Sequence, residues 1–133
     1  MQSDSTRTET VVWPTLTYAD ARAAIAFLVE AFGFVEAAVY GEGDRVDHAQ
    51  LDWPAGGGVM LGSHRADSVL ADRPVGTGSV YIVVEDADEL CRRAVAAGAV
   101  VVKGLTDEDY GSRGFTVRDP QGVIWSFGTY AGE

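Results

Sequence analysis

The chain has 133 residues, of which 47% are hydrophobic and 23% are charged, and its formal net charge is −10. This length and balance predict one compact globular domain that needs neither disulfides nor a metal to fold, and they exclude a disordered chain. The acidic excess argues against nucleic acid and against an anionic membrane surface as partners, because both require a basic protein face. A cationic ligand is compatible with this charge.

The sequence shows no membrane or secretory signal. Its longest apolar runs are well below the ~20 residues that span a bilayer. Residues 1–10 are polar and lack the apolar core of a signal peptide, and the single cysteine, Cys91, suits a reducing compartment. We therefore expect a cytoplasmic protein whose residues 1–10 form a disordered tail.

The first half of the chain alternates between strand and helix patterns. β-branched and aromatic residues predict a strand over 11–18. Asp20 then suits a helix N-cap, apolar residues recur at helical spacing, and Gly33 suits the end of the helix. Glycine-rich turns separate three further predicted strands, over 34–40, 46–53 and 58–62.

The second half repeats this order after a polar stretch without periodicity. A strand over 79–84 precedes a helix that begins after Asp86 and ends at Gly98, and three more strands are predicted over 100–105, 115–118 and 123–128. Asp20 and Asp86 lie 66 positions apart, whereas Gly33 and Gly98 lie 65 apart, so the second helix is one residue shorter. We expect modules over 11–63 and 78–130, joined by a linker over 64–77, in one compact domain.

This doubled strand–helix–three-strand order resembles the vicinal-oxygen-chelate superfamily, which includes glyoxalase I, extradiol dioxygenases and bleomycin-resistance proteins. Residues 16–34 look like its first strand and helix, and His48-Ala-Gln-Leu51 and Val59-Met-Leu-Gly62 look like its third and fourth strands. Asp119-Pro-Gln-Gly122 with residues 123–128 looks like its terminal hairpin. The resemblance covers residues 11–130. It implies an α+β fold of two βαβββ modules that form a concave, partly closed mixed β-sheet with the helices on its outer face.

The concave pocket of this family predicts which side of each strand faces a ligand, because side chains alternate between the two faces of a strand. The loop over 109–114 borders the pocket in the family, although the role of Arg113 in it stays open. Trp13 and Tyr81 are placed to stack on a flat ligand. The expected ligand-binding residues are Trp13, Thr15, His48, Gln50, Leu61, Tyr81, Tyr110 and Ser126.

Metal-dependent members carry His or Glu at four strand positions. The corresponding positions here are Trp13, Leu61, Ser79 and Ser126. An indole, an aliphatic chain and two neutral hydroxyls are poor ligands for a divalent ion, and a shift of one residue brings no better ones. His48 and His64 are the only histidines, and their spacing matches no metal motif. The resemblance therefore implies a non-metal branch of the bleomycin-resistance type, without a metal or cofactor.

Three functions stay open at this point. The leading hypothesis is a homodimer that sequesters a small aromatic or apolar ligand, with positive charge permitted. The alternative is a lyase or isomerase that is metal-dependent or uses His48 as a general base. The interpretation that we prefer for His48 itself is a structural or half-exposed residue, bonded to a neighbour such as Gln50 or Asp52. A third possibility is a module that only dimerises, with Trp13 packed on Tyr81. The sequence leaves open whether the modules pair within one chain or between chains.

Overall fold

The computed structural model describes residues 9–133, and most of the predicted tail therefore lies outside the described residues. In chain order the elements are β1 (Thr15–Tyr18), α1 (Ala21–Phe27), the π-helix η2 (Leu28–Phe32), β2 (Val35–Glu42), β3 (Arg45–Asp52), β4 (Gly58–Ser63), β5 (Ser79–Val83), α2 (Ala87–Ala96), β6 (Val100–Asp107), β7 (Arg113–Arg118) and β8 (Ile124–Gly128). The predicted linker over 64–77 contains neither helix nor strand.

The strands form two four-stranded mixed sheets. The first sheet has the order β1-β4-β3-β2 and the second has the order β5-β8-β7-β6. In each sheet the edge strand that begins the module, β1 or β5, runs parallel to its neighbour, and the other pairs are antiparallel. This arrangement confirms the predicted α+β fold of two modules. Within residues 9–133, no helix has the length and apolar character needed to cross a membrane.

Both helices begin at an aspartate N-cap. The side chain of Asp20 accepts a hydrogen bond from Ala23 N, and that of Asp86 accepts one from Glu89 N, each at 3.0 Å. The first helix is longer because α1 continues into η2, which ends at Gly33 with φ of +93°. A π-turn closes on the fifth residue rather than the fourth. The wider turn thus takes up the one extra residue that the repeat spacing predicts.

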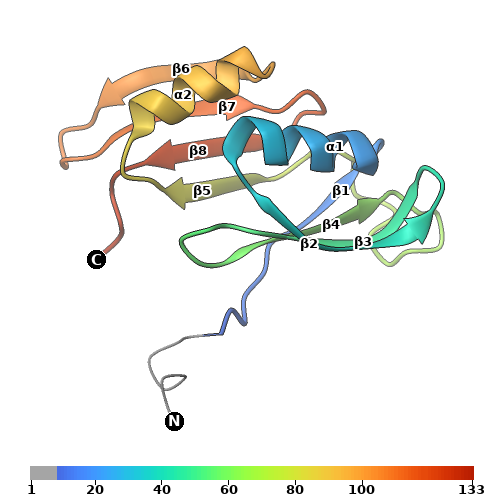
Figure 1. Ribbon diagram of the computed structural model, residues 1–133. Helices are drawn as coiled ribbons and strands as arrows, with labels where there is room; N and C mark the ends of the chain where they lie inside the picture. The colour runs from blue at the N-terminus through green and yellow to red at the C-terminus, as the bar shows by residue number, and fades with distance from the viewer. Residues whose placement is uncertain (1–8) are drawn as a thin grey trace, which may run out of the picture.

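Helices α1 and η2 lie between the two sheets. Helix α1 covers β1, β3 and β4, and α2 covers β6 and β7 (Figure 1). The ring of Phe32 on η2 contacts Trp125 and Phe127 of β8, with ring centroids 5.3 and 4.9 Å apart. Each sheet therefore turns one face toward the helices, and the two opposite faces point away from each other. The buried strand residues on the helix side are Leu16, Ala49, Leu51, Val59, Leu61, Ile82, Phe115, Val117, Trp125 and Phe127.

A buried carboxylate joins the two modules. Asp119, in the turn between β7 and β8, accepts hydrogen bonds from the Tyr18 hydroxyl at 2.7 Å and from Trp125 Nε1 at 3.1 Å. Two backbone N–H groups of its own turn donate to its other oxygen. Beside it, the Gln121 side chain accepts from Asp20 N at 2.9 Å and donates to Asp20 O at 2.7 Å. These contacts hold the second module against the start of α1.

The first strand is shorter than predicted. β1 begins at Thr15, whereas the sequence pattern predicts a strand from residue 11. Pro14 lacks an N–H and cannot donate to a ladder, although its carbonyl accepts a hydrogen bond from Met60 N at 2.9 Å. Val12, which alternation places under the helix, is 81% exposed. The alternation of strand side chains does not apply to Val12, because the strand does not continue past Pro14.

Candidate functional site

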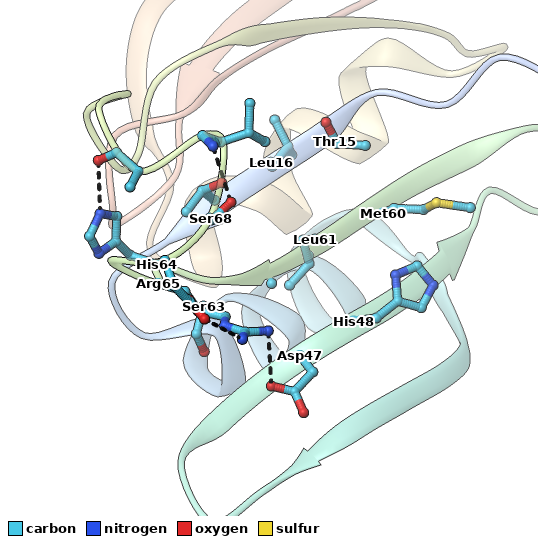
Figure 2. A pocket seen from close by; sticks show the side chains of 15 residues that line it. Thr15, Leu16, Asp47, His48, Met60, Leu61, Ser63, His64, Arg65 and Ser68 are labelled. Atoms are coloured by element: carbon cyan, nitrogen blue, oxygen red, sulfur yellow. Dashed lines mark hydrogen bonds and ion pairs between the residues drawn. The ribbon is translucent and has the colours of Figure 1, made fainter.

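A cleft of about 330 Å³ lies on the face of the first sheet that points away from α1. Its floor comes from β1, β3 and β4, and its wall is the segment 63–71 (Figure 2). The floor residues are Thr15, Thr17, His48, Met60 and Gly62. We call this space the first cleft. It contains two of the predicted ligand-binding side chains, Thr15 and His48.

The predicted inward orientation of Leu61 is wrong. Leu61 pairs with Leu16 on β1 and with Ala49 on β3, and all three side chains are buried on the helix side. Its backbone borders the first cleft, but the neighbouring side chain of Met60 occupies the floor. The run over 58–62 is apolar on both faces, so hydrophobic alternation could not assign its register. The internal repeat could have assigned this register, because Leu61 lies 66 positions before Phe127, which also faces the helices.

The imidazole of His48 stacks on an aromatic partner that the sequence did not indicate. Its ring lies parallel to that of Tyr40 on β2, with centroids 6.2 Å apart and planes 15° apart. Gln50, expected beside it, donates instead to Asp52 Oδ1 at 2.8 Å and does not line the cleft. Within residues 9–133, His48 makes no side-chain hydrogen bond, so its ring nitrogens remain available to a ligand.

The charges at the rim of the first cleft are largely paired. Arg45 Nε lies 2.7 Å from Asp47 Oδ1, and this hydrogen bond holds the pKa of the Asp47 carboxyl below its usual value. Arg65 lies 3.9 Å from Asp47 and 3.1 Å from Asp67. The floor itself carries no formal charge when His48 is neutral. The first cleft therefore suits a ligand with a largely apolar surface and a few hydrogen-bonding groups.

The wall of the first cleft is tied to the sheet at both ends. His64 N donates to Tyr18 O at 3.1 Å, and the His64 imidazole lies 3.1 Å from Ala71 O (Figure 2). At its far end, Gly76 N donates to Thr17 O at 3.0 Å. His64 thus orders this loop, and it does not join His48 in a common site.

A second, smaller cleft of about 190 Å³ lies on the corresponding face of the second sheet. It brings together the other three predicted side chains that the structure places in a cleft, namely Tyr81, Tyr110 and Ser126. The Ser126 hydroxyl lies 2.9 Å from that of Thr116, and the Tyr81 hydroxyl donates to Tyr130 O at 2.7 Å. We call this space the second cleft. Its polar lining is mostly hydroxyl groups.

The charged residues around the second cleft have distinct positions. Lys103 pairs with Glu108 at 2.5 Å on the cleft side, and this partner raises the pKa of the lysine. Arg113 does not line the cleft. Its guanidinium binds Asp88 at 2.7 Å and Asp107 at 3.2 Å. Arg113 therefore fastens the start of α2 to the edge of the second sheet.

Trp13 lies in neither cleft. It precedes β1, its Nε1 donates to Thr10 O at 3.3 Å, and its ring packs over Gly58. A Cβ at Gly58 would lie 2.9 Å from Trp13 Cζ3, so this packing requires glycine. Trp13 and Tyr81 do not form a stacked pair. Within the single chain the predicted pocket residues thus divide between two clefts on sheet faces that point apart, with Trp13 outside both.

The donor groups of the clefts do not fit a divalent metal. Residues at matching positions of the two modules face the clefts: Thr15, Met60, Tyr81 and Ser126. The positions assigned from the sequence lie elsewhere: Trp13 precedes β1, Leu61 is buried on the helix side, and Ser79 begins β5. Neutral hydroxyls and a thioether are weak ligands for such ions. In the described part of the chain, no three His, Cys, Asp or Glu side chains cluster as a metal site.

The comparison with known families agrees with this architecture. A family model described as the Glyoxalase/Bleomycin resistance protein/Dioxygenase superfamily matches residues 10–127. The chain belongs to this superfamily. Uncharacterized proteins of Mycobacterium bovis and Mycobacterium tuberculosis are each 36% identical to it over 130 residues, which cover 90% of this chain and 83% and 74% of theirs.

Solved structures share the fold. TioX from Micromonospora sp. ML1 is 33% identical, with a TM-score of 0.77 over 92% of this chain and 98% of that chain. A superfamily member from Sphaerobacter thermophilus is 18% identical, with a TM-score of 0.68 over 90% and 97% of the two chains. At that identity the likeness shows the fold alone, and function must be argued from the clefts.

Proposed function

We propose that this protein is a cytoplasmic homodimer of the bleomycin-resistance type that sequesters a small aromatic or apolar ligand without a metal ion. The observation that carries the proposal is the chemistry of the first cleft. It has the volume of a small-ligand site and a floor around Met60 and His48 without a carboxylate, and among residues 9–133 no three His, Cys, Asp or Glu side chains group as a metal site. The net charge of −10 also permits a cationic ligand.

The two sheet faces that carry the clefts support dimer formation. Each face is uncovered in the single chain, and large aromatic side chains stand on both: Tyr40 is 62% exposed, Tyr81 48% and Tyr110 62%. Exposed aromatic residues grouped on one face are typical of interfaces. We call the hydrogen bonds of Asp119 and Gln121 between the two modules the seam. The seam fixes the modules so that the clefts of one chain cannot meet. We infer that the first cleft of one copy faces the second cleft of another.

Titration calorimetry against a panel of neutral and cationic aromatic compounds tests the binding function. We expect at least one compound to bind more tightly than millimolar, and Met60→Trp to abolish its binding because the indole fills the floor of the first cleft. Val95→Trp is the matched control, since Val95 is 47% exposed on α2 and lines neither cleft. Failure of every compound to bind, or equal binding by Met60→Trp, contradicts the proposal.

Sedimentation equilibrium tests the dimer separately from ligand binding. We expect a mass twice that of the chain at micromolar concentration. Because Tyr40 and Tyr110 stand on the two faces, Tyr40→Glu and Tyr110→Glu should each shift the equilibrium toward monomers. A monomer at all concentrations, for a chain that still binds its ligand, contradicts the shared cleft.

A lyase or isomerase is the second candidate function, and His48 is the residue that favours it. Its imidazole lies on the floor of the first cleft without a hydrogen-bond partner among residues 9–133, which leaves a ring nitrogen free to accept a proton from a bound substrate. If the protein turns over a bound compound, His48→Ala should lower kcat by 10²-fold or more, the usual contribution of a positioned base. Unchanged turnover removes this role. Elemental analysis of the purified protein decides the metal-dependent version, since a stoichiometric divalent ion would contradict our interpretation of the donor set.

A further inference from the structure

The two clefts differ at one pair of matching glycines. Gly62 on β4 and Gly128 on β8 are 66 positions apart, and each lies two residues after the cleft-facing residue of its strand. Gly62 pairs with Thr17, and Gly128 pairs with Val83. A glycine inside a strand often marks a close approach by another group. The two glycines therefore show what each module places over the same spot.

In the second module this spot is filled by the protein itself. A Cβ on Gly128 would lie 2.7 Å from the Tyr81 hydroxyl oxygen, 3.2 Å from Tyr81 Cε1 and 3.0 Å from Ser112 Oγ. The phenol ring of Tyr81 thus extends over the glycine, and its hydroxyl donates to Tyr130 O at 2.7 Å. Glycine is required here because the phenol occupies the space of a side chain.

In the first module the nearest neighbours of the same spot are backbone atoms of β3 and not an aromatic ring. The three atoms nearest to a Cβ on Gly62 are backbone atoms of Val46 and Asp47, at 3.3–3.7 Å, and no side-chain atom is among them. The residue that matches Tyr81 is Thr15, whose side chain is shorter by a whole ring. Gly62 instead lines the first cleft between Thr17 and His48. The first module therefore has no ring of its own over this glycine, and the part of the first cleft beside Gly62, which we call the hollow, is left for a ligand.

We propose that the hollow over Gly62 receives the ring of a phenolic ligand, in the way that the hollow over Gly128 holds the phenol of Tyr81. This proposal rests on the proposed binding function and names the ligand class. Met60 and Thr17 line the first cleft beside the hollow and offer apolar contacts. Thr15 and His48, whose imidazole has no side-chain hydrogen bond among residues 9–133, line the same floor and offer partners for a ligand hydroxyl. A planar ring fits because the spot is bounded by flat strand backbone.

The probe is 4-methylphenol, which is the tyrosine side chain as a free molecule, and the readout is the backbone amide of Gly62 in ¹H–¹⁵N spectra. We expect millimolar 4-methylphenol to shift the Gly62 amide by its ring current and to leave the Gly128 amide unmoved. The non-planar 4-methylcyclohexanol should bind at least tenfold more weakly. Equal binding of the two compounds, or shifts that spare Gly62, overturns the proposal.

Two reciprocal variants exchange the chemistry of the modules. Thr15→Tyr should close the first hollow, so that the Gly62 amide is shifted without any probe and no longer responds to it. Tyr81→Thr should open the second hollow, so that the Gly128 amide now responds. Val95→Tyr is the matched control and should behave like the wild type, because Val95 is exposed on α2 and lines neither cleft. If Thr15→Tyr does not fold, Tyr81→Thr alone decides, because Tyr81 is 48% exposed and its loss leaves the core intact.

The outcomes separate this proposal from the proposed function. Shifts of Thr17 and His48 without Gly62 retain the binding function and overturn the phenol hollow. If no aromatic compound shifts any amide of either cleft, the binding function and the phenol hollow both fail.

Discussion

Removal of one hydroxyl tests the seam between the modules. Tyr18 is fully buried and donates to Asp119 Oδ2 at 2.7 Å, and Asp119 is 3% exposed. Tyr18→Phe leaves that oxygen with Trp125 Nε1 as its single side-chain donor. A hydrogen bond to a buried charge is worth about 1.5–3 kcal/mol, which for a chain of this length lowers Tm by about 5–10 °C.

The assay is thermal and urea unfolding followed by circular dichroism. The matched control is Tyr110→Phe, because Tyr110 is 62% exposed and its hydroxyl donates to no group among residues 9–133. We expect this control to change stability by less than about 0.5 kcal/mol. A Tyr18→Phe protein as stable as the control would refute the role of the seam.

The pH dependence of folding stability tests the burial of Tyr18 independently. Burial first, and then the neighbouring Asp119 carboxylate, raises the pKa of the Tyr18 phenol far above its ordinary value near 10. The unfolded chain therefore loses this proton first, so its contribution to stability is complete below pH 10 and is lost as the pH rises further. The stability difference between wild type and Tyr18→Phe should narrow by about 1.4 kcal/mol between pH 9 and pH 11. A constant difference contradicts the burial of this phenol.

Two further substitutions probe the same seam. Gln121→Ala removes both hydrogen bonds to the Asp20 backbone and should cost about 1–2 kcal/mol in urea unfolding, whereas Gln121→Glu keeps an acceptor for Asp20 N and should cost less. Gly76→Ala should lower the free energy of unfolding by at least about 3 kcal/mol, because Gly76 has φ of +69° and an added Cβ overlaps Gln121 O. Gly104 has open space around its Cβ position, so Gly104→Ala should change the free energy of unfolding by less than about 0.5 kcal/mol. Equal stability of Gly76→Ala and Gly104→Ala would contradict the packing of Gly76 against Gln121.

The fold could be predicted from local sequence signals because the two modules carry the same ones. Asp20 and Asp86 both cap helices, and Gly33 and Gly98 both follow helix ends at positive φ. The extra residue of the first helix was visible in the spacing. The sequence spacing does not show that this extra residue forms a π-turn, because the choice of turn depends on how Phe32 packs against the second sheet.

The site was predicted only where a strand has one polar and one apolar face. That condition holds for Tyr81 and Ser126, whose neighbours Ile82 and Trp125 are buried on the opposite side. It fails at Leu61, where both faces are apolar. The stack of His48 on Tyr40 and the separation of the clefts depend on strand pairing and on the seam, which no local pattern encodes.

The most direct test of the account is complementation between two variants that each block a different cleft. Met60→Trp blocks the first cleft and Ser126→Trp blocks the second, so neither homodimer should bind the tightest aromatic compound of the panel. In a mixed dimer, the open first cleft of the Ser126→Trp chain faces the open second cleft of the Met60→Trp chain. Equal mixing of the refolded chains should therefore restore about a quarter of the wild-type binding sites, as random pairing in a two-fold dimer requires. If mixing restores none, the binding site is not shared between two copies, and the central claim is wrong.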